Sequence, residues 1–269
     1  MPVGSKDVEL WLSLLAEDLY KNEAIIIERL TASLAVGVRI SVIVQSPRGS
    51  EVTRAIGELQ DRVAGAVIYD GGEPCLCQSR NLALRYAGKR FLVLADWDTD
   101  YAWPQVFRAL GLLYHERGTI GFSMYSDNPN HIQGKVLVGL SSESIKVVTG
   151  LSTPLLLFDR PMLEKTGLQL DTNMGINGSK RWLPFGEEFK LAVSVLATDS
   201  RIIGIPLQWA RRDKHGSGFH AGACQKLVVI AYALLTSEAK AASRILLFSF
   251  VLSKVFALIK LGVTKKNVC

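Results

Sequence analysis

The stretch that decides the fold is "QSRNLALRYAGKRFLVLADWD", residues 78–98. Its first half has the apolar spacing of a helix that stops at Gly88, and its second half is a short apolar run typical of a buried strand. That run ends at Asp96, and Asp98 and Asp100 follow at alternate positions. In open α/β sheets, ligands bind beyond the carboxyl ends of the strands. The stretch therefore predicts that these acids lie at the ligand-binding edge of such a sheet.

Outward from this stretch, short apolar runs alternate with segments of helical spacing. The strands expected up to this point are residues 8–16, 38–46, 65–70 and 90–96. Residues 22–35 and 50–63 between them have helical spacing, and Ser50 is the expected cap of the second helix. This alternation predicts an α/β fold with a Rossmann-like, mostly parallel central sheet flanked by helices.

The rest of the chain continues the alternation and then becomes helical. The further expected elements are a helix after Pro104, strands near residues 119–126 and 134–141, a strand turning into a helix over 153–167, and a helix followed by a strand over 186–206. Two apolar helices close the chain. We expect one domain over residues 1–220 and a C-terminal helical tail over residues 221–269.

Composition narrows the class of protein. Thirty-one basic and twenty-five acidic side chains in 269 residues leave a net charge of +6, a mild attraction to phosphates or anionic surfaces that gives no reason to expect a nucleic-acid partner. Four cysteines, of which only Cys75 and Cys77 are close together, predict neither a disulfide framework nor a four-ligand zinc site. The N-terminus has no pattern of an export signal, so we expect a cytoplasmic protein.

Several motifs in order carry a resemblance to a known family. Ser79, Arg80 and Asn81 match an "a-R-N" that opens a helix, and the next strand ends in D-x-D at Asp96 and Asp98. Further matches are the y-N-e and S-L of Tyr20, Asn22, Glu23, Ser33 and Leu34, the F-x-R of Phe158 and Arg160 with Gly167, "GEE" at 186–188, and "HGSGFH" at 215–220. In these motifs, over roughly residues 9 to 220, the chain resembles the family 2 glycosyltransferases, which have the GT-A fold.

The resemblance implies transfer of a sugar from a nucleotide-diphosphate donor, a UDP-sugar first of all, with inversion at the anomeric carbon. A divalent metal, Mn²⁺ or Mg²⁺, is implied at the D-x-D acids, where carboxylate oxygens suit such ions. Asp98 would bind the metal together with either Asp96 or Asp100, and the choice between these pairs stays open. His215 is either a late metal ligand or a surface histidine.

The same resemblance assigns the general base and the donor contacts. The second acid of the family's E-D pair is the usual base, which gives that role to Glu188, with Glu187 beside it as the alternative. Arg80, Asn81 and Asp96 are implied to contact the donor.

Two positions depart from the family's pattern. Glu188 stands where the family has Asp, which lengthens the reach of the carboxylate by one methylene. Gln45 and Ser46 stand in place of the acids of a D-D-G-S turn that contacts the donor base. An amide and a hydroxyl can still hydrogen-bond a pyrimidine, so both remain donor-binding candidates.

The acceptor side is less defined. Trp182 is either an acceptor platform, because sugars stack on aromatic rings, or a packing residue. The apolar, lysine-bearing segment 243–266 predicts either a helix on the inner face of an anionic membrane or one packed on the domain or on a second subunit of a homodimer. The acceptor would be a glycan or a lipid-linked sugar. The competing hypothesis is a catalytically altered GT-A-like protein that binds a nucleotide or a partner.

Overall fold

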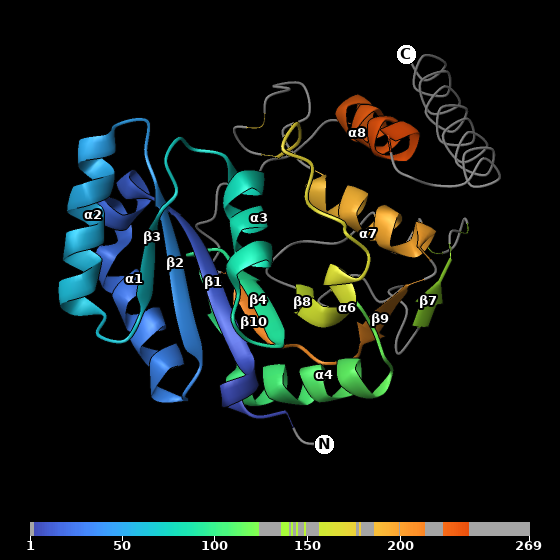
Figure 1. Cartoon of the computed structure of the whole chain (residues 1–269), viewed down its shortest axis with the longest axis horizontal. Helices are drawn as coiled ribbons and strands as arrows, with labels where there is room; N and C mark the ends of the chain where they lie inside the picture. Colours follow the sequence, from blue (N-terminus) through green and yellow to red (C-terminus); the bar gives the residue numbers. More distant parts are fainter. Residues whose placement is uncertain are drawn as a thin grey trace, which may run out of the picture.

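The computed structural model describes residues 3–123, 136–139, 156–175, 186–198, 200–212 and 223–236, and the single residues 141, 144, 148 and 178. The described residues form an eight-stranded sheet with the strand order β3-β2-β1-β4-β8-β6-β9-β7 and a two-stranded sheet of β5 and β10. Helices cover both faces of the large sheet (Figure 1). The predicted α/β architecture, a mostly parallel central sheet flanked by helices, is confirmed.

The first half of the chain alternates strand and helix after a short 3-10 turn at Ser5–Asp7. Its elements are β1 (Val8–Leu15), α1 (Ala16–Ala35), β2 (Arg39–Gln45), α2 (Gly49–Arg62), β3 (Val67–Asp70), α3 (Leu76–Tyr86) and β4 (Phe91–Ala95). The four strands are parallel, and Leu12 of β1 lies opposite Val42 of β2 and Ala95 of β4. The carboxyl ends of these strands therefore meet at one edge of the sheet.

The second half adds a mixed region. Its elements are β5 (Thr99–Tyr101), α4 (Trp103–His115), β6 (Ile120–Ser123), β7 (Val136–Val138), β8 (Leu156–Asp159), α6 (Arg160–Glu164), α7 (Glu187–Ala197), β9 (Arg201–Ile205), β10 (Ala210–Arg212) and α8 (Ala223–Thr236). Strand β8 is antiparallel to both β4 and β6, and β7 closes the far edge antiparallel to β9. No helix over the described ranges is both long and apolar enough to cross a membrane.

The core is divided by the sheet into two layers. Alternate residues of the central strands point to opposite faces, so Leu10 belongs to the layer that includes α1, α2 and α4, whereas Trp11 belongs to the layer that includes α3, α7 and α8. Strands β1 and β4 are buried on both faces, which explains why they read as continuous apolar runs rather than as alternating ones. The segment 78–98 thus lies at the centre of the fold.

Two local predictions need correction. Helix α2 begins at Gly49, so Ser50 lies inside its first turn and is not its cap. Ser46 takes a capping-like part instead, because its hydroxyl accepts a hydrogen bond from the Arg48 N–H at 3.2 Å and donates one to Glu51 at 2.7 Å. Helix α3 begins at Leu76, three residues earlier than expected, so Arg80 lies in its second turn rather than at its start.

Candidate active site

A buried arginine joins three acids at the carboxyl edge of the sheet. Helix α3 places the Arg80 side chain in the interior, where it is 3% exposed. Its Nη2 donates to Asp96 Oδ1 at 3.0 Å, and its Nη1 donates to Glu187 Oε1 at 3.1 Å and to Glu188 Oε1 at 3.2 Å. We call these four residues the Arg80 cluster. It brings together the R-N, D-x-D and G-E-E motifs, which are far apart in the sequence.

The backbone at the start of α7 places Glu187 and Glu188 in the first turn of the helix. Gly186 has φ +94°, a left-handed conformation that favours glycine, and a Cβ there would lie 2.2 Å from Cγ1 of Val229 in α8. Glu187 and Glu188 follow in the first turn, where the positive end of the helix dipole stabilises carboxylates. The glycine of the motif thus permits both the turn and the close approach of α8.

The electrostatics of the cluster are unbalanced, since three carboxylates surround one guanidinium. Burial disfavours the charged form of Arg80, but Asp96, Glu188 and Glu187 outweigh burial and raise its pKa. Burial, and then repulsion by Glu188, raises the pKa of Glu187 to about 8, although Arg80 opposes the shift. Glu187 Oε2 is buried without a hydrogen-bond partner among the described residues. Glu187 therefore holds a proton more tightly than an ordinary glutamate does.

Glu187→Gln is expected to remove a pH dependence of stability. Because the pKa of Glu187 is about 8 in the folded protein and ordinarily 4.5, the folded state binds this proton more tightly than the unfolded state between those values. The stabilisation is complete below about pH 4.5 and is lost as the pH rises through about 8. Urea denaturation of the wild type should show a loss on the order of 2–4 kcal/mol over that range.

The glutamine variant should lack most of this loss. Glu28→Gln is the matched control, because Glu28 is an exposed residue of α1 and the change of charge is the same. Equal pH slopes for the wild type and Glu187→Gln would contradict the predicted proton on Glu187.

The three aspartates after β4 have different surroundings. The Asp96 side chain is 22% exposed and faces Arg80. Asp98 is buried, and Asp100 is exposed on β5, opposite Arg211 of β10. The β5–β10 ribbon, which the sequence did not predict, thus takes Asp100 into a separate small sheet. Asp96 and Asp98 thus stay near the end of β4, and which pair would bind a metal stays a prediction.

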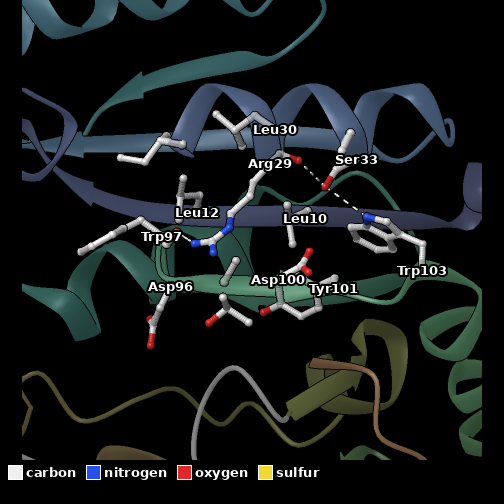
Figure 2. Close-up of a pocket in the computed structure, with 14 residues that line it drawn as sticks. Leu10, Leu12, Arg29, Leu30, Ser33, Asp96, Trp97, Asp100, Tyr101 and Trp103 are labelled. Atoms are coloured by element: carbon white, nitrogen blue, oxygen red, sulfur yellow. Dashed lines mark hydrogen bonds between the residues drawn. The ribbon is translucent and has the colours of Figure 1, made fainter. Parts of the chain in front are cut away.

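A small cavity lies beneath the D-W-D turn, on the α1 side of the sheet (Figure 2). Its volume is about 50 Å³, enough for a few water molecules and far below the several hundred Å³ of a nucleotide-sized pocket. Figure 2 shows Arg29 reaching from α1 to the Trp97 carbonyl oxygen, to which its Nη1 donates at 2.6 Å, while the Asp96 carboxylate points away from Leu10 and Leu12. The cavity is therefore too small for a nucleotide sugar.

The expected donor contacts besides Arg80 and Asp96 hold the backbone. The Asn81 amide donates to the Leu170 carbonyl oxygen and accepts from the Leu170 N–H, both at 2.8 Å. The Gln45 amide donates to the Glu73 carbonyl oxygen at 2.9 Å, which holds the loop between β3 and α3. Ser46 is occupied at the start of α2, as described above. These bonds give all three residues a structural part, and their contact with a donor stays a prediction.

Other predicted sites lie outside the described residues. These are Trp182, His215 with the rest of "HGSGFH", and the segment 243–266.

The acids at this edge can be compared with the ligands that a divalent metal ion requires. Within the described part of the chain, no three His, Cys, Asp or Glu side chains are arranged to hold an ion. Mg²⁺, however, is usually held by one or two carboxylates together with substrate phosphates rather than by a cage of protein ligands. Asp96 and Asp98 provide such an incomplete set, with Asp96 bonded to Arg80. In their chemistry these acids suit an ion shared with a diphosphate, and its binding here stays a prediction.

Comparison with known proteins identifies the fold. No protein-family model matches the chain, and no curated protein matches it by sequence. Among solved structures, S. aureus TarS 1-349 is similar with a TM-score of 0.60, at 11% identity, over 93% of this chain and 72% of that one. The mannosyltransferase PcManGT from Pyrobaculum calidifontis is similar with a TM-score of 0.52, at 15% identity, over 97% and 77% of the two chains.

GalNAc-T7 is similar with a TM-score of 0.52, at 12% identity, over 85% of this chain and 47% of that one. The chain has the fold of these glycosyltransferases. The GT-A fold implied by the motifs is thereby confirmed, and identities this low establish the fold alone.

A second polar cluster lies around Asp171, next to α7, and the sequence did not predict it. Asp171 accepts hydrogen bonds from Lys190 of α7, from the Tyr232 hydroxyl of α8 at 3.1 Å and from the Asn173 N–H at 2.9 Å. Burial opposes the charge of Asp171, but the bonds from Lys190 and Asn173 lower its pKa to about 2. In the sequence, a single acid before a turn does not indicate such a cluster. The cluster ties α8 to the helix that begins with Glu187.

Cys77 is buried next to the same site. Its thiol donates to the Met174 carbonyl oxygen at 3.1 Å. Burial and the nearby Glu187 raise the pKa of this thiol, which makes the reactive thiolate scarce.

Proposed function

We propose that this protein is an inverting glycosyltransferase that moves a sugar from a nucleotide-diphosphate donor to a hydroxyl group of a glycan or of a lipid-linked acceptor. The observation that carries the proposal is the Arg80 cluster, in which a D-x-D acid and the G-E-E acids share one buried guanidinium at the ligand-binding edge of a GT-A fold. Acids from separate elements that converge at this edge of an α/β sheet are typical of functional sites.

In the proposed reaction, Glu188 is the general base. Its side chain is 15% exposed and that of Glu187 is 5% exposed, so an acceptor hydroxyl can reach Glu188 more readily. As Glu188 takes the proton, the acceptor oxygen forms its bond to the anomeric carbon while the bond from that carbon to the diphosphate oxygen breaks. Attack and departure on opposite faces invert the anomeric centre.

The other members of the cluster hold this base in place. Arg80 Nη1 donates to both glutamates, which fixes their carboxylates side by side at the start of α7. Glu187, with its raised pKa, keeps a proton in the buried half of the pair and reduces the repulsion between the two. A divalent ion would be held by Asp98, and also by Asp96 if the hydrogen bond from Arg80 to Asp96 breaks. The ion would stabilise the negative charge that develops on the leaving diphosphate.

The donor class follows from the similar proteins. TarS 1-349 has been solved with UDP-GlcNAc and with UDP, PcManGT with GDP-Man and Mn²⁺, and GalNAc-T7 with UDP, GalNAc and Mn²⁺. These support a nucleotide sugar as the donor and a divalent metal, Mn²⁺ or Mg²⁺, as the cofactor. We propose a UDP-sugar because two of these three proteins are solved with uridine nucleotides.

Hydrolysis of the donor tests this proposal. Purified protein with Mn²⁺ or Mg²⁺ should hydrolyse at least one of a panel of UDP- and GDP-sugars slowly, with nucleoside diphosphate release as the readout, and EDTA should stop it. Asp98→Ala should lose metal-dependent binding of the nucleotide at least tenfold, because the proposed ligand of the ion is removed. Asp61→Ala, on the exposed face of α2, is the matched control and should change nothing.

Two outcomes count against transfer. If the protein neither binds any nucleoside diphosphate nor hydrolyses any donor, the proposed function is wrong. Binding without hydrolysis or transfer to any acceptor would instead support the alternative of a catalytically altered, nucleotide-binding GT-A protein.

A further inference from the structure

A wide groove lies at the opposite edge of the sheet from the Arg80 cluster. It runs between the C-terminal half of α4, the residue before β4 and the end of β8, and its volume is about 690 Å³. Arg90 and Asp159 mark this edge, since Phe91 of β4 lies opposite Asp159. Asp96 follows the other end of β4, roughly 16 Å away for five residues at about 3.3 Å each. In Figure 1, α4 lies along the lower side of the sheet, away from α7 and α8.

The groove carries uncompensated positive charge. Arg90, Arg108 and Arg117 line it, and all three are exposed. Arg90 Nη2 forms an ion pair with Asp159 at 2.9 Å, whereas no acid over the described ranges forms an ion pair with Arg108 or Arg117. Two guanidinium groups that pair with no described acid therefore line the same groove. Such a groove attracts anions, and guanidinium groups match the geometry of phosphate oxygens.

Arg117 is held at the rim by the end of α4. It has φ +53° and is the one non-glycine residue with positive φ among the described residues. Gly118 next to it packs against β9, where a Cβ would lie 2.4 Å from Cγ1 of Ile203. The glycine at this helix end is used for packing at position 118, so Arg117 adopts the left-handed conformation. That conformation costs an ordinary residue on the order of 1 kcal/mol. The turn is closed by the bond from the Arg117 N–H to the Tyr114 carbonyl oxygen at 3.1 Å.

The groove also has apolar and aromatic walls. Leu112 is 41% exposed and Tyr114 is 37% exposed, and the Arg90 guanidinium lies 4.5 Å from the centre of the Tyr114 ring. Asp159 is buried at the floor, and its Oδ1 has no hydrogen-bond partner among the described residues. This oxygen is shielded from solvent, so Asp159 acts on the groove through its ion pair with Arg90.

We propose that this groove binds a phosphate ester. Arg108 and Arg117 bind the phosphate oxygens, and Leu112 and Tyr114 contact the rest of the ligand. Sugar phosphates and the headgroup of phosphatidylglycerol share this chemistry. The site lies outside the donor site and stands whether or not the protein transfers a sugar.

The experiment titrates the full chain, in EDTA so that metal-dependent binding at the donor site is absent, with glucose 6-phosphate by calorimetry. In parallel, vesicles of phosphatidylglycerol or of phosphatidylcholine are used in co-sedimentation. The test variant is Arg108→Gln with Arg117→Gln. The control is Arg48→Gln with Arg54→Gln, two exposed arginines of the α2 region, which lowers the net charge by the same amount.

Binding of glucose 6-phosphate that the test variant weakens at least tenfold and the control leaves unchanged supports a soluble ligand. Binding of phosphatidylglycerol vesicles alone, with the same difference between variants and none to phosphatidylcholine, supports the lipid headgroup. Either binding should weaken as the salt concentration rises. No binding of either probe, or equal losses in the test and control variants, overturns the proposal.

Discussion

Glu188→Gln is expected to lower the rate of sugar transfer by a factor of about 10²–10⁴, the usual contribution of a general base. Glutamine is close to glutamate in size and can keep a hydrogen bond from Arg80, but it cannot take the proton of the acceptor hydroxyl. Binding of the donor nucleotide should stay within about threefold of the wild type, because the change leaves the proposed metal ligand Asp98 in place. Steady-state transfer and calorimetric nucleotide binding measure the two effects.

The matched control is Glu164→Gln, which removes the same charge from a half-exposed side chain of α6 outside the site. It should transfer at the wild-type rate. If Glu188→Gln transfers at the wild-type rate, the base lies elsewhere, and Glu187→Gln would then be the next variant to assay. If Glu188→Gln also loses nucleotide binding, the residue has a part in the donor site rather than in proton transfer.

The edge of the sheet at which the site lies could be predicted from the sequence. Continuous apolar runs fixed the buried parallel strands, and acids that directly follow such a run must lie at the carboxyl edge. The order of the motifs then placed Glu187 and Glu188 near Asp96. Periodicity could not show that Arg80 joins them, since a helix has the same apolar spacing whether one arginine points inward or outward.

The sequence also could not predict which groups the side-chain amides of Asn81 and Gln45 bind. Asn81 and Gln45 were expected at the donor, and each holds the backbone of a distant or adjoining segment. A buried backbone group must find a partner, but the sequence does not say which side chain supplies it. The three-residue strand β5 is likewise too short for a period, and its pairing with β10 depends on a contact far along the chain.

The Arg80 cluster makes a further strong prediction, about stability. Arg80→Met is expected to lower the free energy of unfolding by about 3–5 kcal/mol at pH 8, because removing one partner leaves buried carboxylates without their counter-charge. Arg80→Lys should lose less, since one ammonium keeps the charge but cannot bond three carboxylates with the same fork. Arg85→Met, at the exposed end of the same helix, is the control and should change stability by less than about 1 kcal/mol.

The pH dependence separates charge from packing in this variant. Near pH 5 Glu187 is largely protonated, because its pKa is about 8, so the loss of the guanidinium should cost less there than at pH 8. Adding Glu187→Gln to Arg80→Met should restore part of the stability at pH 8, and a double-mutant cycle from urea denaturation measures this coupling. Equal losses at both pH values and no coupling would mean that Arg80 stabilises the fold through packing alone. The expected result is instead that one guanidinium holds the acids together, while burial and the neighbouring Glu188 keep a proton on Glu187.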